Sequence, residues 1–175
     1  RTMHPRIKRL FAIALMFLAL LPASARAQIT VAFYSHELGS SFPHAFIVVK
    51  GTPQGGGEPV DVNFGFTAKS VAPALLLGPV TGVIETAKPG YVRNSDRKFG
   101  FAISDQQYAA LMAHVEKWRM LPGKSYDLNR RNCIHFVGEA AQVLGLKVVF
   151  DKKLLKRPRS FLENVVRLNP ALASK

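Results

Sequence analysis

The sequence predicts an α+β domain in which an antiparallel sheet is covered by packed helices. Three observations lead to this prediction. Short segments rich in β-branched and aromatic residues fill the first half of the chain, and turns with glycine or proline separate them. Two segments whose apolar residues recur at helical spacing follow in the second half. A run of strands followed by helices is typical of the α+β class.

The first 27 residues are predicted to be a secretory signal peptide. Basic residues without any acid occupy Arg1–Arg9, an unbroken apolar run covers Leu10–Leu21, and Ala25–Ala27 supplies a small-x-small cleavage pattern. The apolar run is short for a membrane span, which needs about 20 residues; an uncleaved anchor is the alternative. We therefore expect one exported domain, periplasmic or secreted, covering residues 28–175.

Three strands are predicted at the start of this domain. Residues 29–35 are rich in β-branched and aromatic side chains, and a loop at 36–43 follows. Residues 44–51 are apolar on both faces, which suits a central strand. Residues 60–66 alternate between apolar and polar, so a turn at 52–59 makes a hairpin with the central strand.

Residues 67–98 give weaker signals. We predict a short helix at 71–77, a short strand at 81–86 and a turn at Pro89–Gly90, with no functional interpretation for this region. A further strand is predicted at 97–103.

A long helix is predicted to begin at Ser104, where Gln107 completes a capping box, and to end before Pro122. His114 falls off the apolar stripe of this helix and is predicted to lie at the surface. The stripe itself is predicted to be core: Tyr108, Leu111, Met112, Val115 and Trp118.

A second helix is predicted to start after Asn132, a good N-cap, and to stop at Gly145. Its apolar stripe begins with Cys133 and is expected to face the sheet. A last helix is predicted to start at Ser160, where Glu163 would close another capping box.

The chain is basic, with a formal net charge of +13 at pH 7. Much of the excess lies late in the sequence, at Lys147, Lys152, Lys153, Lys156, Arg157 and Arg159. We expect this segment to contact an anionic surface, either lipid headgroups or wall polymers; a solvated basic surface is the alternative. Export argues against nucleic acid as the partner.

The chain contains one cysteine, Cys133, so no disulfide forms within it. A lone thiol in an exported protein is buried and inert, paired between chains, or reactive. Its predicted place in the first turn of a helix favours the thiolate, which is the nucleophilic form. We expect no metal site and no cofactor, because the histidines are scattered and the glycines at 55–57 lack the context of a phosphate-binding loop.

Among the histidines, His44 is the best candidate for a base. It opens the apolar central strand, where an imidazole needs a polar partner; a backbone carbonyl is the alternative partner. His135 lies ~200° around the helix from Cys133 and points away from it. His36 falls in the first loop, where the sequence assigns it no fixed position.

The order of these segments resembles the circularly permuted branch of the papain-like thiol fold, which includes NlpC-like relatives and the lecithin retinol acyltransferase family. Asn132–Val137 (NCIHFV) is similar to the Asn-Cys-x-His-Phe-Val signature of the latter. His44 precedes Cys133 in the chain, as in the permuted branch. The resemblance covers roughly residues 44–145.

This resemblance implies that Cys133 is the nucleophile and His44 the general base. It also implies a third residue on the strand after the His strand, where the family often has another histidine and this sequence has none. Asn63 is the preferred candidate and Asp61 the alternative, because both share the polar face of that strand. The backbone N–H of Cys133 is the expected oxyanion donor.

The resulting hypothesis is an exported cysteine hydrolase or acyltransferase that acts on an amide or ester bond of cell-wall peptide or lipid. The first alternative is a non-catalytic binding module of the envelope on the same fold. The second alternative is a dimer linked through Cys133.

Overall fold

The computed structural model describes residues 28–37, 42–70 and 73–172, so the predicted signal peptide lies outside the described residues. Five strands form one antiparallel sheet in the order β4-β3-β2-β1-β5. Their bounds are β1 Ile29–His36, β2 His44–Gly51, β3 Val60–Ala68, β4 Gly82–Glu85 and β5 Asp96–Ile103. The helices are α2 Ala74–Leu77, α3 Pro89–Arg93, α4 Asp105–Arg119, α5 Cys133–Val143 and α6 Pro158–Leu168, and a 3-10 helix follows at Pro170–Leu172. This arrangement confirms the predicted α+β class with an antiparallel sheet and packed helices.

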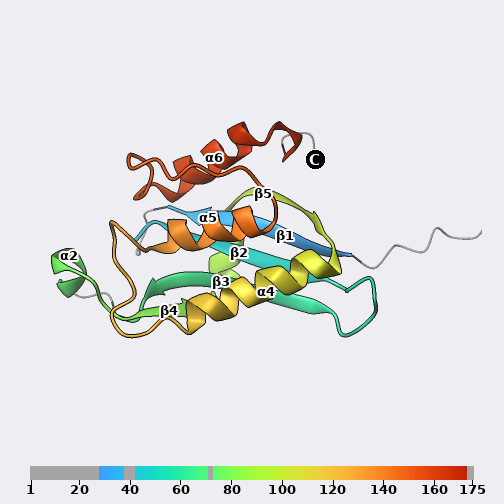
Figure 1. Cartoon of the computed structure of the whole chain (residues 1–175), viewed down its shortest axis with the longest axis horizontal. Coiled ribbons are helices and arrows are strands. Elements are labelled where there is room, and N and C mark those ends of the chain that lie inside the picture. The colour runs from blue at the N-terminus through green and yellow to red at the C-terminus, as the bar shows by residue number, and fades with distance from the viewer. Residues whose placement is uncertain (1–27, 38–41, 71–72, 173–175) are drawn as a thin grey trace, which may run out of the picture.

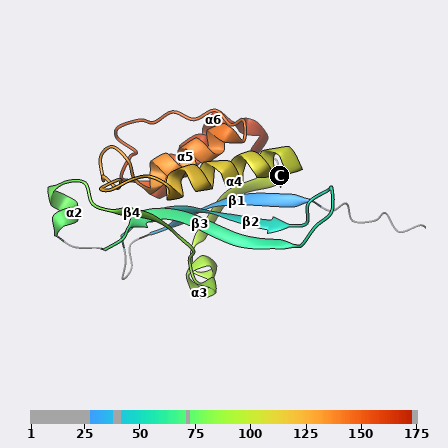
Figure 2. The same cartoon turned by 60° about the horizontal axis from the view of Figure 1, so that its bottom comes forward.

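The two faces of the sheet carry different layers. Helices α4, α5 and α6 lie together on one face, whereas α3 lies on the opposite face (Figures 1 and 2). In β2, Ala45, Ile47 and Val49 belong to the main core and are fully buried. Phe46 is on the other side, where its ring lies 5.8 Å from that of Tyr91 in α3. The apolar character of β2 on both faces is therefore explained by cover on both sides.

Helix α4 begins as predicted, with the Ser104 hydroxyl and the Gln107 side chain forming a capping box. Its apolar stripe faces the core, and the Trp118 ring meets Phe66 of β3 edge-on at 4.7 Å. The prediction for His114 is wrong, because this side chain is 5% exposed. Its Nε2 lies 3.1 Å from the carbonyl oxygen of Phe136, which satisfies the ring although it interrupts the apolar pattern.

Two further local predictions differ from the structure. Pro89–Gly90 begins the short helix α3, because a proline in the first turn is preorganised for a helix. Helix α6 also starts with proline, at Pro158, two residues before the predicted Ser160. The predicted capping box of Ser160 and Glu163 therefore does not form, and Glu163 instead pairs with Lys98 of β5 at 2.9 Å.

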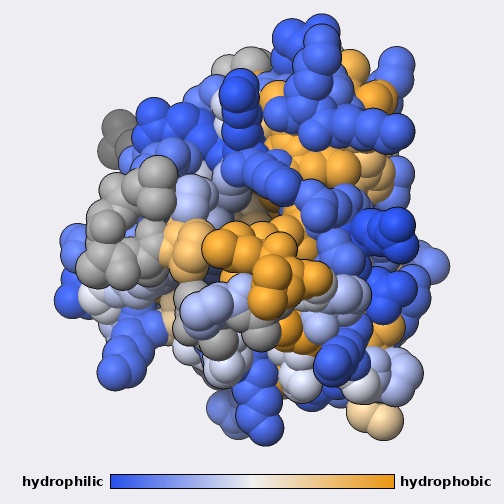
Figure 3. All heavy atoms as spheres, turned by 90° about the vertical axis from the view of Figure 1, so that its left-hand side faces the viewer, coloured by the Kyte–Doolittle hydropathy of each residue, from blue (hydrophilic) through white to orange (hydrophobic). Residues whose placement is uncertain are grey.

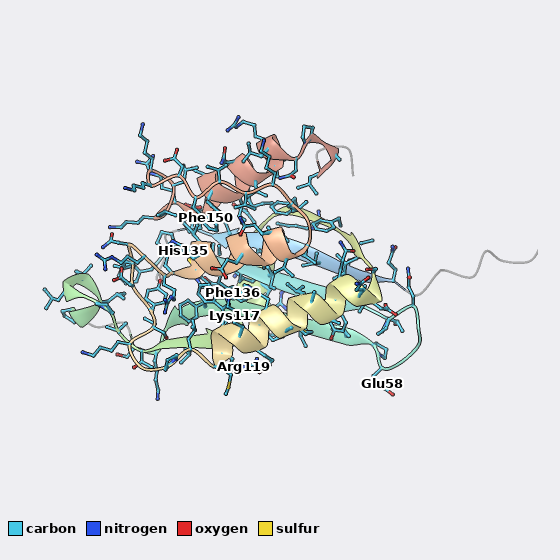
Figure 4. The ribbon with its side chains drawn as sticks, in the orientation of Figure 1. Glu58, Lys117, Arg119, His135, Phe136 and Phe150 are labelled. Carbon is cyan, nitrogen blue, oxygen red and sulfur yellow. The ribbon has the colours of Figure 1, made fainter. Side chains whose placement is uncertain are left out.

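Helix α5 lies between α4 and α6, over β2 and β3. Figure 4 shows Phe136 on the side of α5 that faces α4, and His135 with Phe150 on the side toward α6. The rings of His135 and Phe150 stack at 5.5 Å, so His135 is turned away from the core stripe as the helical spacing predicts. Among the described residues, no helix is long and apolar enough to cross a bilayer.

Candidate active site

A cavity of about 630 Å³ lies where β2 and α5 both begin. His44 comes to it from the first residue of β2, and Cys133 from the first residue of α5. The sequence therefore predicted two residues that the fold brings to one cavity, although 88 other residues separate them in the chain. Much of the remaining wall is apolar or aromatic, including Phe42, Phe46, Leu75, Leu128 and Tyr126.

Asn132 fixes the start of α5. This residue is 3% exposed, and its Oδ1 accepts a hydrogen bond from the backbone N–H of Ile134 at 2.9 Å. Its Nδ2 donates to two carbonyl oxygens, that of Leu128 at 2.8 Å and that of Leu155 at 2.7 Å. Asn132 thus caps the helix, as predicted, and also ties the segment before α5 and the segment before α6 to the same point.

Cys133 lies on the helix-side wall of the cavity and is 5% exposed. Backbone N–H groups of Ala45, Ile134 and Cys133 itself interact with its sulfur and lower the pKa of the thiol. Burial acts more strongly in the opposite direction and raises this pKa to about 11. The predicted preference for a thiolate is therefore not met in this cavity: the helix-end donors are present, but desolvation of the charge outweighs them.

His44 is held in place mainly by packing. Its ring lies 6.1 Å from that of Phe46, and a methyl group added at Gly65 would come within 2.4 Å of its Nε2. A side chain larger than glycine at position 65 is therefore excluded while the imidazole keeps this place. Burial, followed by the influence of nearby His36, lowers the pKa of His44 to about 4, so the ring is neutral at pH 7.

The thiol and the imidazole are neighbours through the backbone. Cys133 meets the N–H of Ala45, the residue directly after His44. No hydrogen bond joins the sulfur to the His44 ring, and both groups are neutral at pH 7 in this arrangement. A thiolate–imidazolium pair is accordingly not the resting state of the cavity.

A second histidine lies beside His44 on β1. His36 pairs directly with His44 across the two strands, and its ring stacks on Tyr91 at 4.2 Å. Its Nδ1 lies 3.0 Å from the Ser95 hydroxyl, which donates its own proton to the carbonyl oxygen of Tyr91. The Ser95 oxygen is therefore placed to accept a hydrogen bond from His36 Nδ1–H.

The structure does not bring Asn63 to His44. Asn63 pairs with Val48, four residues along β2 from His44, which places it about 13 Å away along the strand. Its amide is already engaged with the backbone of Ala87, accepting from the N–H at 2.6 Å and donating to the carbonyl oxygen at 3.1 Å. Asp61 is on the surface, where it pairs with Lys50 at 3.2 Å.

Two residues, one beside the thiol and one beside His44, had no role in the sequence analysis. Tyr126 lines the cavity, is 8% exposed, and its pKa is raised by burial and then by the proximity of Cys133. Its backbone is fixed by two hydrogen bonds to Val80, at 2.8 and 2.9 Å. The position of His36 opposite His44 follows from the register of β1 and β2, which the loop length alone does not specify.

Among the described residues, no group of three or more His, Cys, Asp or Glu side chains is arranged to hold a metal ion. The reactive groups that line the cavity are the Cys133 thiol, the His44 imidazole and the phenols of Tyr91 and Tyr126.

No protein-family model and no curated protein sequence matches the chain. Among solved structures, the chain is similar to TseH, an effector of a Type VI secretion system, with a TM-score of 0.51 and 14% sequence identity. The match covers 81% of this chain and 89% of the TseH chain. At this identity the likeness concerns the fold, and the α+β architecture is consistent with a papain-like fold.

Proposed function

We propose that this protein is an exported cysteine hydrolase or acyltransferase that uses Cys133 as its nucleophile and His44 as its base. The observation that carries the proposal is the position of the thiol: it opens helix α5 and faces the cavity that His44 also lines. Nearby backbone N–H groups, first that of Ala45, favour its thiolate. A likeness in fold to a secretion-system effector is in keeping with an exported protein.

In the proposed reaction the Cys133 sulfur attacks the carbonyl carbon of an amide or ester. The new S–C bond forms while His44 takes the thiol proton, and that proton then passes to the amine or alcohol that leaves. Water resolves the acyl-enzyme in a hydrolase, and an amine or alcohol resolves it in an acyltransferase. Because both groups are neutral at rest, proton transfer accompanies the attack rather than preceding it.

The developing oxyanion needs hydrogen-bond donors. The backbone N–H of Cys133 is the first candidate, as at other helix-borne nucleophiles, and the Tyr126 hydroxyl is the second. Tyr126 also lines the cavity, and the electrostatic influence of Cys133 on its hydroxyl is in keeping with this role.

His36 takes the place of Asn63 as the candidate positioning residue. It lies opposite His44, has its tautomer fixed by Ser95, and acts on His44 through charge rather than through a hydrogen bond. Protonation of His36 makes protonation of His44 less favourable, so His36 tunes the base.

A decisive experiment exposes the protein to p-nitrophenyl esters of short and long chains and to small peptide amides, and measures the intact mass. We expect one acyl group on Cys133, no adduct in Cys133→Ala, and loss of most of the adduct in His44→Asn. His36→Asn is the matched histidine change on the neighbouring strand; it should keep acylation and shift its pH profile. Absence of any adduct under conditions where the folded protein is intact would contradict the enzyme assignment.

One observation favours a second candidate, a non-catalytic binding module on the same fold. The pKa of Cys133 is raised and that of His44 lowered, and among the described residues no side chain hydrogen-bonds to the His44 ring. A protein that only binds a ligand in this cavity would retain ligand binding, but no acylation, in the same experiment.

A further inference from the structure

The open end of the cavity carries unusually exposed apolar side chains. Leu76 and Leu77 of α2 are 74% and 88% exposed, and Phe42, in the segment before β2, is 55% exposed. Leu76 and Phe42 also line the cavity. Figure 3 shows a hydrophobic patch in the middle of this face, bordered by hydrophilic residues. A contiguous patch of this kind is typical of a surface that binds a partner.

These side chains do not serve the core. Helix α2 lies at one end of the molecule, in the segment that connects β3 and β4 (Figures 1 and 2). In this helix Leu75 is turned inward and is 6% exposed, whereas Leu76 and Leu77 face solvent. The outward leucines are therefore not explained by the stability of the domain.

Two lysines line the same cavity as Leu76 and Phe42. Lys88 and Lys156 are exposed and line the cavity, and they outnumber Glu85, the acidic residue among its described lining residues. The segment leading into α6, which contains Lys156, lies at the same end of the molecule as α2 in Figure 1. Within the described residues, no ion pair engages Lys88, Lys152, Lys153, Lys156 or Arg157.

From these observations we infer that this face docks onto a lipid bilayer that contains anionic lipids. Leu76, Leu77 and Phe42 enter the interface between headgroups and acyl chains, while Lys88 and Lys156 contact the anionic headgroups. Soluble wall polymers offer the charge but no apolar phase for the leucines, so the observed combination favours a bilayer. The cavity then opens toward the membrane surface. This inference goes beyond the proposed reaction and does not require the thiol.

The single cysteine makes a site-specific test possible. In the full chain, Cys133→Ala is combined with Leu77→Cys, and the new thiol carries an environment-sensitive fluorophore. Vesicles of phosphatidylcholine alone and with phosphatidylglycerol are then added. Met120→Cys, at a position 78% exposed and outside the cavity, is the matched control. Since the label reports on the surroundings of position 77, membrane contacts made elsewhere in the chain do not imitate the result.

We expect the label at position 77 to shift to the blue with anionic vesicles, and the label at position 120 to change little. Lys156→Gln should weaken the response about fivefold, because one lysine near an anionic surface contributes roughly this factor. Lys147→Gln removes the same charge at an exposed position beyond the far end of α5, and should change the response less than twofold.

Three results would overturn the inference. In the first, the label at position 77 would remain in water with every vesicle. In the second, it would respond equally to vesicles without anionic lipid. In the third, a soluble polyanion without lipid would produce the same shift. Acylation of Cys133 is measured on the unlabelled protein, so a failure of docking and a failure of the proposed reaction are distinguished.

Discussion

At the scale of single residues, the properties of Cys133 follow from two opposed effects. Its place at the first turn of α5 supplies backbone N–H donors to the sulfur, whereas burial removes the water that would stabilise the thiolate. Burial lowers the pKa of the neighbouring His44 imidazole, which favours its neutral, basic form. In the absence of substrate, Cys133 is therefore in its neutral thiol form.

The first prediction concerns the pH dependence of thiol alkylation. Because the pKa of Cys133 is raised to about 11, the rate of iodoacetamide labelling should keep rising with pH between pH 6 and 10, with no plateau near neutrality. Labelling in urea, where the thiol is exposed, should follow an ordinary cysteine titration. A plateau of fast labelling below pH 7 in the folded protein would show that a thiolate–imidazolium pair exists at rest.

A second residue-scale prediction concerns Gly65. The added methyl group of Gly65→Ala must displace the His44 ring, because it would come within 2.4 Å of Nε2. The displaced ring should be better hydrated, so its pKa should rise from about 4 toward 6.5 in an NMR titration of the histidine rings. Gly90→Ala is the control, since its new methyl group meets only the Arg93 side chain, at 3.7 Å. An unchanged His44 titration would refute the described packing.

At the scale of elements, the start of α5 decides the geometry of the site. Asn132 connects the helix to two other segments through one side chain, so the position of Cys133 depends on the carbonyls of Leu128 and Leu155 as well as on the helix. The segment before α6 is consequently part of the wall of the cavity rather than a remote linker.

The prediction at this scale is that Asn132→Ala destabilises the protein by about 2–3 kcal/mol. The substitution removes a helix cap and leaves two carbonyl oxygens without their donor. Urea denaturation followed through the single tryptophan, Trp118, measures the loss. Asn129→Ala, the same change at a nearby exposed position, should alter the free energy of unfolding by less than about 0.5 kcal/mol. Equal effects of the two substitutions would contradict the role assigned to Asn132.

At the scale of the whole molecule, neutral histidines that folding wholly or partly removes from water link stability to pH. The pKa values of His44, His114 and His135 are all lowered, in each case mainly by burial. Below pH 6.5 the unfolded chain therefore binds more protons than the folded protein. Stability should be fully present above pH 6.5 and should fall as the pH decreases toward 4, the folded-state pKa of His44.

This prediction is checked by urea denaturation at pH 7.5, 6.0 and 5.0. The midpoint should decrease with each step, and the decrease should be smaller in His44→Asn, which has one fewer group to protonate on unfolding. His36→Asn serves as the comparison at the neighbouring strand. A midpoint that is constant over this range would show that these histidines are hydrated in the folded protein.

The class of the fold and most of its elements could be predicted from the sequence. Alternation of side chains located the hairpin of β2 and β3, and the capping residues located the starts of α4 and α5, because these signals act within a few residues of the chain. For the same reason Cys133 could be placed at a helix start, and His44 at the start of a buried strand, before any contact between them was known.

Which residues come into contact, and what pKa values they have, depends on the tertiary structure. The register of β1 against β2 places His36 beside His44, whereas the amide of Asn63 is taken by Ala87. His114 is buried because a carbonyl from α5 satisfies it, which helical periodicity cannot reveal. The state of the Cys133 thiol depends on how much water the surrounding segments exclude. These properties arise from contacts between distant segments, and no pattern within one segment encodes them.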